Sequence, residues 1–295
     1  MPTAHVQDFP TTWLDVFAEA PMQGTFHLVV HDADRLSDDV MTRLSARTRL
    51  AETSFLQTAT VAGATYRHRI YVPGKEVPFA GHPSLGAAAA HAWATGQRSG
   101  RYVQQTASGL QRLDFRLEER RGEVALTQNP AVFGAVVDRA TALAIAGLPP
   151  DCAHPTLVPE WVSTGMPTLV IPLAAPAHLA RVAFDWRAFG AALSAWPGVP
   201  AFNCYICAAT APGRWAARCF GEDPATGEDP ATGSAAGPLG AYLKQHTGMS
   251  AIRVDQGVEM GAHSVLHVST ADEVVVTGAV WLVGTGMLRL PVGRR

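Results

Sequence analysis

The stretch that decides the fold is "VPFAGHPSLGAAAAHAWATG", residues 77–96. It has the form of a helix that begins at Gly81 or His82, with Pro83 in the first turn, where its missing N–H costs nothing. The body is almost wholly alanine, glycine and leucine and has no charged face. Because a helix of this kind is normally buried on all sides, we expect a central helix enclosed by a sheet.

A second stretch repeats this design about 150 residues later. "ATGSAAGPLGAYLKQHTG", residues 231–248, begins a helix at Gly233 and Ser234 and ends it at Gly248. Two buried helices of small residues predict two structurally similar halves. Both helix N-termini present free N–H groups and a partial positive charge, so the pair would suit a substrate that carries a carboxylate.

The rest of the chain alternates strand-like and helical patterns. Residues 36–50 have the apolar spacing of a helix that Ser37 would cap. The Asn-Pro pair in residues 126–134 predicts a junction, so we expect domains at 1–128 and 129–279, with the strand at about 280–295 returning to the first. Strand-like patterns fill residues 13–20, 26–32, 66–74 and 201–210, and residues 273–292 read as strands joined by glycine-containing turns.

Composition limits the possible partners. The 295 residues carry a formal net charge of -2, which leaves no basic surplus for nucleic acid. The first residues lack the pattern of a secretion signal and no run is long enough to cross a bilayer, so we expect a cytoplasmic protein with a small-molecule partner. Cys204 and Cys207 form a C-x-x-C inside a strand pattern, where they would point to opposite faces and serve as buried apolar residues.

Candidate acid and base groups lie in loops rather than on solvated helix faces. They are Glu52, Glu76, His82, Asp223 and Asp229. Each of them taken alone is more often a cap or a turn residue. A phosphate-binding loop is excluded at residues 227–234, because the spacing is one residue too long and the lysine is absent.

Four segments together resemble the signature segments of the PhzF family, the phenazine-biosynthesis isomerases and their relatives. They are "LAETSFL" (50–56), "VPFAGHPSLGAAAA" (77–90), "VSTGMPTLVIPL" (162–173) and "EDPATGSAAGPLGAYL" (228–243). The resemblance implies an α+β fold like that of diaminopimelate epimerase, with two pseudo-symmetric domains that each wrap a mixed sheet around a central helix. It also implies an active site in the cleft between the domains, a homodimer, and neither a metal nor an organic cofactor.

The matched motifs carry the family's functional positions onto this sequence. The resemblance implies a cofactor-independent isomerase that moves a proton between carbons of a small unsaturated cyclic amino or imino acid in specialised-metabolite biosynthesis. Glu52 takes the place of the principal acid/base carboxylate. The remaining catalytic positions match His82, Asp229 and Ser234, and the substrate-binding positions match Gly81, Pro83, Ser84, Thr232, Gly233, Thr25, Thr164 and Gly165.

Two alternatives stay open within this fold. An amino-acid epimerase or racemase would need a thiol from each domain, and none of the four cysteines lies in the matching loops. A protein that binds a metabolite without turning it over would not require all four polar residues of the predicted site.

The phrase Glu-Asp-Pro-Ala-Thr-Gly occurs twice, at residues 222–227 and 228–233. Only the second copy continues directly into the helix, so we assign the function to Asp229 rather than Asp223. Three segments depart from the family pattern, namely 23–27, Thr168 and 262–263, and they favour a changed substrate.

Overall fold

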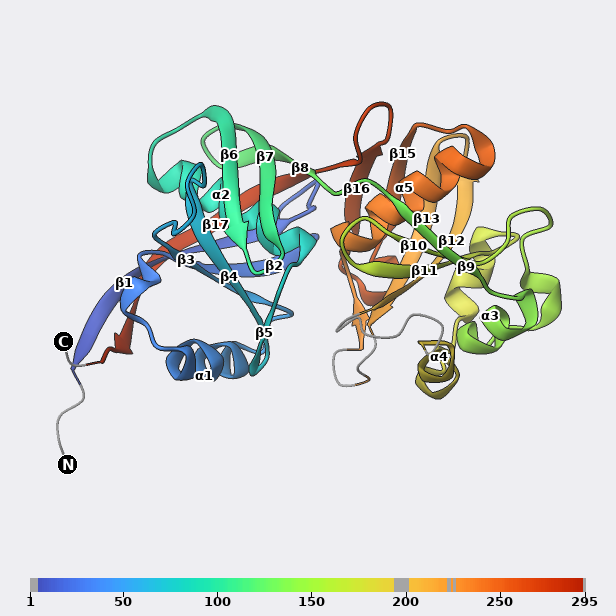
Figure 1. Ribbon diagram of the computed structural model, residues 1–295, viewed down its shortest axis with the longest axis horizontal. Coiled ribbons are helices and arrows are strands. Elements are labelled where there is room, and N and C mark those ends of the chain that lie inside the picture. The colour runs from blue at the N-terminus through green and yellow to red at the C-terminus, as the bar shows by residue number, and fades with distance from the viewer. Residues whose placement is uncertain (1–4, 194–201, 222–223, 225–226, 294–295) are drawn as a thin grey trace. The chain divides into compact units, whose positions relative to one another are not determined.

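The computed structural model describes residues 5–193, 202–221, 224 and 227–293 (Figure 1). The chain divides into two compact units. Unit 1 comprises Met1–Leu126 and Gly278–Arg295, and unit 2 comprises Thr127–Thr277. No helix among the described residues has both the length and the apolar character that a membrane crossing requires.

Unit 1 is a ring of eight strands around one helix. The pairing runs β1–β2–β3–β4–β6–β7–β8–β17 and returns to β1, so the sheet closes on itself. The short β5 pairs only with β4. The strands are β1 (Val6–Val16), β2 (Thr25–Val30), β3 (Thr53–Gln57), β4 (Tyr66–Val72), β5 (Lys75–Val77), β6 (Ser99–Thr106), β7 (Gly109–Leu117), β8 (Arg121–Thr127) and β17 (Val275–Pro291).

The helix inside this ring is α2 (Gly81–Ala94), which contacts β1, β2, β3, β4 and β7. Eleven of its fourteen residues are buried, which confirms the expectation of an enclosed central helix. Helix α1 (Asp38–Thr48) lies outside the ring, where Met41 packs with Leu28 and Phe55 of the strands. The Ser37 side chain accepts a hydrogen bond from the Val40 N–H and caps α1 as predicted. A 3₁₀ turn, η1 (Ala33–Arg35), precedes it.

Unit 2 buries α5 (Gly233–Thr247) against its sheet, and eleven of the fifteen residues of this helix are buried. Helices α3 (Arg139–Ala146) and α4 (Trp186–Ala192) share a second apolar core with Trp161 and Phe220 of the sheet. Its strands are β9 (Val132–Val136), β10 (Glu160–Ser163), β11 (Pro167–Pro172), β12 (Asn203–Ala211), β13 (Arg214–Gly221), β14 (Glu228–Asp229), β15 (Ala251–Gln256) and β16 (Ser264–Ser269), and its 3₁₀ turns are η2 (Pro150–Cys152), η3 (Pro176–Arg181) and η5 (Val258–Met260).

The two units repeat one pattern of strand pairing. In unit 1, β2 pairs in parallel with β3 and β4 in parallel with β6, and antiparallel pairs lie between and beside them. In unit 2, β11 pairs in parallel with β12 and β13 in parallel with β15, again with antiparallel pairs between and beside them. In both units the buried helix follows a strand and its short hairpin partner, β4 with β5 in unit 1 and β13 with β14 in unit 2. The α+β fold with two pseudo-symmetric halves is thereby confirmed.

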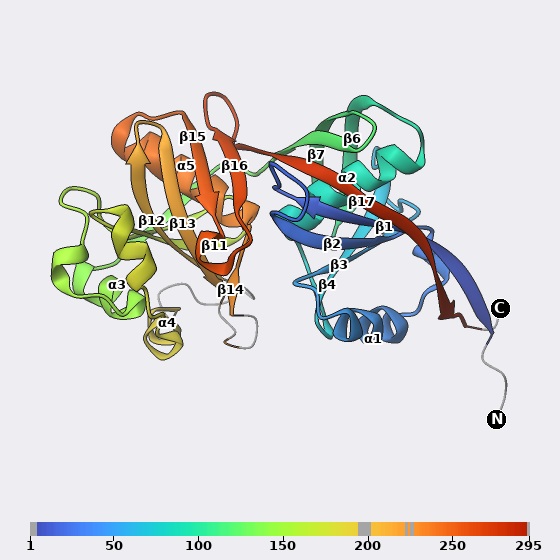
Figure 2. The ribbon, with the colours of Figure 1, turned by 180° about the vertical axis from the view of Figure 1, so that it is seen from behind.

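The expectation for the C-terminal segment was wrong. Residues 275–291 form one continuous strand, β17, rather than several strands joined by turns. Its first three residues pair with β16, and residues 280–291 pair with β1, beside which it runs in Figure 2. Gly278 does not turn the chain: a Cβ on it would lie 2.2 Å from Cδ1 of the buried Phe17 ring. The glycine is required by packing, which the sequence pattern could not distinguish from a turn.

The cysteines match their expected structural role. All four are buried free thiols, and Cys204 and Cys207 lie on β12. Burial raises the pKa of the Cys204 thiol well above its usual value, so it stays protonated.

Candidate active site

The first cluster of candidate residues lies at the N-terminus of α2. Glu52 directly precedes β3 and His82 is the second residue of the helix; His82 Nε2 lies 3.2 Å from Glu52 Oε2. The His82 side chain is 2% exposed, and burial lowers its pKa to about 3. The imidazole is therefore neutral near pH 7, and the contact joins an uncharged ring to a carboxyl group. The structure thus brings together two residues that lie 30 positions apart in the sequence.

A second imidazole, that of His27, lies beside this pair. Strands β2 and β3 are parallel, and Leu28 lies opposite Thr53. The preceding residues, His27 and Glu52, therefore lie next to each other along the two neighbouring strands. The His27 and His82 rings meet edge to face, with centroids 5.2 Å apart and planes at 87°. Gly86 of α2 makes room for this ring, since a Cβ there would lie 2.9 Å from His27 Cδ2. The sequence departure at residues 23–27 therefore places an aromatic base next to the candidate catalytic pair.

A one-directional chain of hydrogen bonds begins at the same helix. The Ser84 hydroxyl donates to the Ala80 carbonyl oxygen, 2.7 Å away, so its oxygen can only accept from Gln104 Nε2 at 2.8 Å. Gln104 must then present Oε1 to His68 Nδ1, which donates across 3.0 Å. The amide orientation of Gln104 and the tautomer of His68 thus both follow from one backbone carbonyl.

The chain continues to His27. Burial lowers the pKa of His68 to about 4, so its ring is neutral and Nε2 accepts from the Ser54 hydroxyl at 2.7 Å. Ser54 then accepts from His27 Nε2 at 2.8 Å. Burial, together with the nearby His82 and His68 rings, lowers the pKa of His27 well below its usual value. This network holds His27 as a neutral ring with Nδ1 deprotonated.

The predicted substrate-binding residues of unit 1 divide into two groups. The Ser84 hydroxyl already has two protein partners and is fully buried, so its structural role explains its presence. Gly81 and Pro83 form the first turn of α2 next to His82. Thr25 begins β2 two residues before His27, on the same face of the strand, and is 4% exposed.

The second cluster lies at the N-terminus of α5. Asp229 ends the two-residue strand β14, and Thr232 is the N-cap position of the helix. Thr232 Oγ1 lies 2.5 Å from Asp229 Oδ2, and the Ala231 N–H donates to Oδ1 across 3.4 Å. Burial raises the pKa of Asp229, and these two hydrogen bonds oppose the rise. A carboxyl group with a raised pKa suits general acid/base work.

Ser234 and the segment around Gly165 contribute to the same region. Asn203 Nδ2 lies 3.3 Å from Ser234 Oγ and 3.2 Å from Met166 Sδ. The Gly165 N–H donates to Ser163 Oγ across 3.2 Å. Residues 163–166, which include the predicted positions Thr164 and Gly165, therefore lie near the start of α5.

Gln128 links the two remaining predicted positions. The Thr164 hydroxyl donates to Gln128 Oε1 across 2.5 Å, and Gln128 Nε2 donates to the Gly233 carbonyl across 2.8 Å. Thr164 is 3% exposed, so its contacts are with the protein. It holds the start of α5 through Gln128.

The two enclosed helices differ from the others at their N-termini. Side chains cap the helices α1, α3 and α4, through Ser37, Asp138 and Asp185. Neither α2 nor α5 has a side-chain cap, although Thr232 stands at the N-cap of α5 with a hydroxyl that could serve. The first-turn N–H groups of these two helices are therefore left without a side-chain acceptor, next to the candidate acid/base groups.

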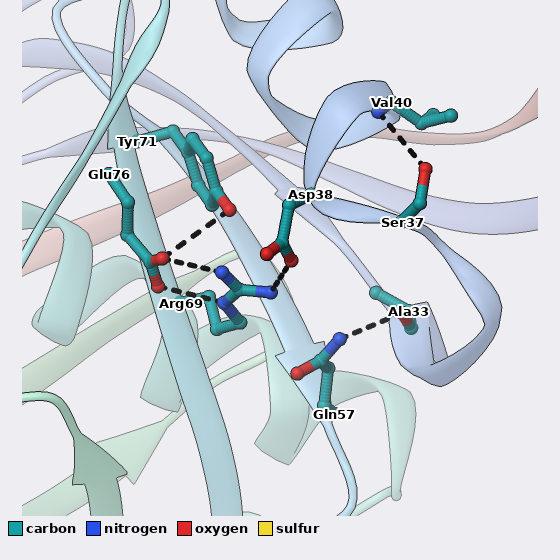
Figure 3. A network of polar contacts seen from close by, with 8 residues as sticks. All are labelled: Ala33, Ser37, Asp38, Val40, Gln57, Arg69, Tyr71 and Glu76. Carbon is teal, nitrogen blue, oxygen red and sulfur yellow. Dashed lines mark hydrogen bonds and ion pairs between the residues drawn. The ribbon is translucent and has the colours of Figure 1, made fainter.

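Two of the candidate carboxylates do not join these clusters. Glu76 receives two hydrogen bonds from Arg69, at 2.7 and 2.5 Å, and Arg69 also donates to Asp38 at 2.6 Å (Figure 3). Glu76 thus ties β5 to β4, and through Arg69 to α1, instead of serving as a free acid or base. Asp223 and most of the first copy of the repeated phrase lie outside the described residues.

Sequence reasoning missed most of the buried polar residues that support both clusters, including Gln256, which accepts from the Thr232 N–H; the others are Ser54, His68, Gln104, Asn203 and Gln128. His68 left a signal, because it lies on the buried face of the alternating strand β4. Among the residues the structure describes, no group of three or more His, Cys, Asp and Glu side chains could hold a metal ion.

The fold and these clusters define the class: an α+β protein with two similar units, each presenting acid/base groups at the uncapped end of an enclosed helix. The profile of the PhzC-PhzF family, described as "Phenazine biosynthesis-like protein", matches residues 14–288. The chain belongs to this family.

Sequence relatives agree over almost the whole chain. The chain is 34% identical to the trans-2,3-dihydro-3-hydroxyanthranilate isomerase of Pseudomonas chlororaphis over 86% of its length and 87% of the relative's. It is 33% identical to the enzyme of the same name from Pseudomonas aeruginosa, over 92% and 94%. This chain is accordingly an isomerase.

Solved structures agree on the fold. A predicted epimerase from Pseudomonas aeruginosa is similar with a TM-score of 0.82 and 30% identity, over 95% of this chain and 99% of that one. A PhzF family protein from Bacillus anthracis has a TM-score of 0.79 over 96% and 99%, at 21% identity. A hydroxyproline epimerase from Agrobacterium vitis shares the fold with a TM-score of 0.61, at 14% identity over 96% and 93%.

Proposed function

We propose that this chain moves a proton between carbons of a small unsaturated cyclic amino or imino acid, by carboxylate general acid/base catalysis without a cofactor. The observation that carries the proposal is the Glu52–His82 pair, 3.2 Å apart at the uncapped N-terminus of a buried helix. The names of the sequence relatives support the reaction type.

Glu52 is assigned the proton transfer. Its carboxylate removes a proton from one carbon, the electron pair of that C–H bond shifts along the unsaturated system, and the carboxylic acid returns the proton to another carbon. One side chain thereby acts first as base and then as acid. The neutral His82 ring can hold the carboxyl group through its Nε2 without neutralising it as a cation would.

The helix ends are assigned the substrate's carboxylate. Free N–H groups and the helix dipole favour an anion by roughly 0.3 to 1 kcal/mol, and by up to about 2 when partly buried. The absence of side-chain caps on α2 and α5 leaves these groups available to a ligand. Asp229 and Ser234 are assigned to the substrate's other polar groups.

We propose a substrate that differs from the one in the relatives' name. Residues 23–27, Thr168 and 262–263 depart from the family pattern, and the first of these segments places the His27 ring against His82. The Thr168 side chain is fully buried and lies 3.4 Å from the Met166 carbonyl, where a larger imidazole would need space. An unsaturated, amino-acid-derived acid fits these changes. We further propose that the protein acts as a homodimer.

An epimerase that uses thiols is less well supported. Cys219 pairs in register with Asp229 and is the thiol beside the second cluster. Burial raises its pKa well above the usual value, which disfavours the thiolate that such chemistry needs.

The test is exchange of carbon-bound hydrogen. Wild-type protein is incubated in D₂O with a panel of unsaturated cyclic amino and imino acids, and deuterium at carbon is followed by NMR. We expect incorporation to fall roughly a hundred- to ten-thousand-fold in Glu52→Gln. Glu76→Gln is the matched control and should retain activity, because Glu76 is held by Arg69.

Two outcomes would sink the proposal. Full incorporation in Glu52→Gln would exclude the assigned base. Tight binding of a panel member without deuterium at any carbon would instead favour a protein that only binds the metabolite.

A further inference from the structure

Gln256 is buried completely and directs its whole side chain at the Asp229 segment. It ends β15, with a relative exposure of 0%. Oε1 accepts from the Tyr205 hydroxyl at 2.8 Å and from the Thr232 N–H at 3.2 Å. Nε2 donates to the Asp229 carbonyl at 2.7 Å and to Thr232 Oγ1 at 2.9 Å. All four hydrogen-bonding positions of the amide are therefore occupied by protein groups.

The orientation of this amide is fixed by the backbone. The Thr232 N–H can only donate, so the atom facing it must be the amide oxygen. The Asp229 carbonyl can only accept, so the atom facing it must be the amide nitrogen. The second hydrogen on Gln256 Nε2 must then point at Thr232 Oγ1.

The partners of Thr232 Oγ1 determine to which atom its hydroxyl hydrogen is donated. One lone pair accepts from Gln256. The Cys219 thiol also contacts this hydroxyl, but its sulfur is only a weak hydrogen-bond acceptor. The carboxyl oxygen Asp229 Oδ2, 2.5 Å away, is the stronger acceptor, so the Thr232 hydroxyl donates to it.

This arrangement makes the two oxygens of Asp229 different. Oδ2 is committed as an acceptor, whereas Oδ1 has only the longer contact with the Ala231 N–H, at 3.4 Å. A proton on Asp229 must therefore sit on Oδ1. The other titratable groups facing this carboxyl are Cys219 and Tyr205, and both stay neutral near pH 7 because burial raises the pKa of each.

We infer that Gln256 is a positioning residue which, through Thr232, restricts proton exchange at Asp229 to the single oxygen Oδ1. The inference rests on the proposed function only in one respect, namely that Oδ1 exchanges its proton with the substrate. In this assignment Asp229 uses only Oδ1 toward the substrate. Gln256 acts through Thr232 and does not contact the substrate itself.

The sign of a pKa change tests the direction of the Thr232 bond without any substrate. The ¹³C carboxyl signal of Asp229, assigned by its loss in Asp229→Asn, is titrated in wild type and Thr232→Val. A donated hydrogen bond stabilises the ionised form, so its removal should raise the pKa of Asp229 by about one unit or more, and Thr232→Ser should restore it. A lowered or unchanged pKa in Thr232→Val would overturn the inference.

Gln256 itself is tested with the same readout. Gln256→Met keeps the length of the side chain but cannot orient Thr232, so the pKa of Asp229 should also rise, and the acidic limb of the deuterium-exchange pH profile should move up with it. Tyr205→Phe removes one bond to Gln256 and leaves Thr232 held, so both readouts should stay at wild-type values. A folded Gln256→Met variant with an unchanged pKa would refute the role.

The two hypotheses fail separately. Wild-type protein that exchanges no deuterium would contradict the proposed function, while the NMR titration would still decide the role of Gln256. If Gln256→Met does not fold, Gln256→Asn, whose shorter amide is drawn back from Thr232 Oγ1, takes its place in the same titration.

Discussion

The buried histidines of unit 1 should make the protein sensitive to mild acid. His82 and His68 are each 2% exposed, and burial lowers their pKa values to about 3 and about 4. In the unfolded chain a histidine titrates near 6.5, so between these values the unfolded state binds more protons. Their contribution to stability is complete above about pH 6.5 and is lost as the pH falls toward the folded values.

The magnitude follows from linkage. Each proton taken up only on unfolding lowers the free energy of unfolding by about 1.4 kcal/mol for every pH unit below the pKa of the unfolded chain. At pH 5, about 1.5 pH units below 6.5, each histidine has therefore lowered the free energy of unfolding by about 2 kcal/mol. Wild type should therefore lose about 4 kcal/mol from His82 and His68 between about pH 7.5 and pH 5. Other groups shift the total, so the comparison is made with a variant.

Urea unfolding at the two pH values, followed by circular dichroism, measures this loss. His68→Asn retains a donor toward Gln104 but cannot take up a proton, so the variant should lose about 2 kcal/mol less than wild type between the two conditions. Equal pH dependence in wild type and His68→Asn would refute the assignment of a neutral buried ring.

Two further substitutions test packing and the role of an ion pair. Gly278→Ala should destabilise the protein by about 1 to 3 kcal/mol in chemical denaturation, because the new Cβ would lie 2.2 Å from Cδ1 of buried Phe17; unchanged stability would show that the ring has room to move. Glu76→Gln should cost about 1 kcal/mol in the same assay, because it weakens the paired bonds to the partly exposed Arg69, and a loss of deuterium exchange in this variant would contradict its structural assignment.

The sequence predicted the elements whose cause is local. Helices α2 and α5 follow from runs of small residues that begin with glycine, and α1 follows from its spacing and from Ser37. The identities of Glu52 and His82 came from matched motifs. Their 3.2 Å contact depends on the placement of β3 against α2, which no spacing along the chain encodes.

The supporting polar residues escaped prediction for the same reason. Gln104 reaches its hydrogen-bond partners only because β6 pairs with β4 and lies near Ser84. Gln256 reaches its partners only because β15 pairs with β13. A glutamine in a strand pattern is ordinary in a sequence. It acquires a role when burial removes water and each hydrogen of its amide must find a partner.

Strand β17 ties the order of synthesis to the order of folding. One edge of β1 pairs with β2, but the other edge pairs with β17, where Val6 lies opposite Pro291, so this second edge finds its neighbour only after unit 2 has been synthesised. Unit 2, by contrast, is contiguous from Thr127 to Thr277 and has its strands available earlier. The unit that begins first is therefore completed last, and during synthesis the edge of β1 must wait exposed until the C-terminal strand arrives.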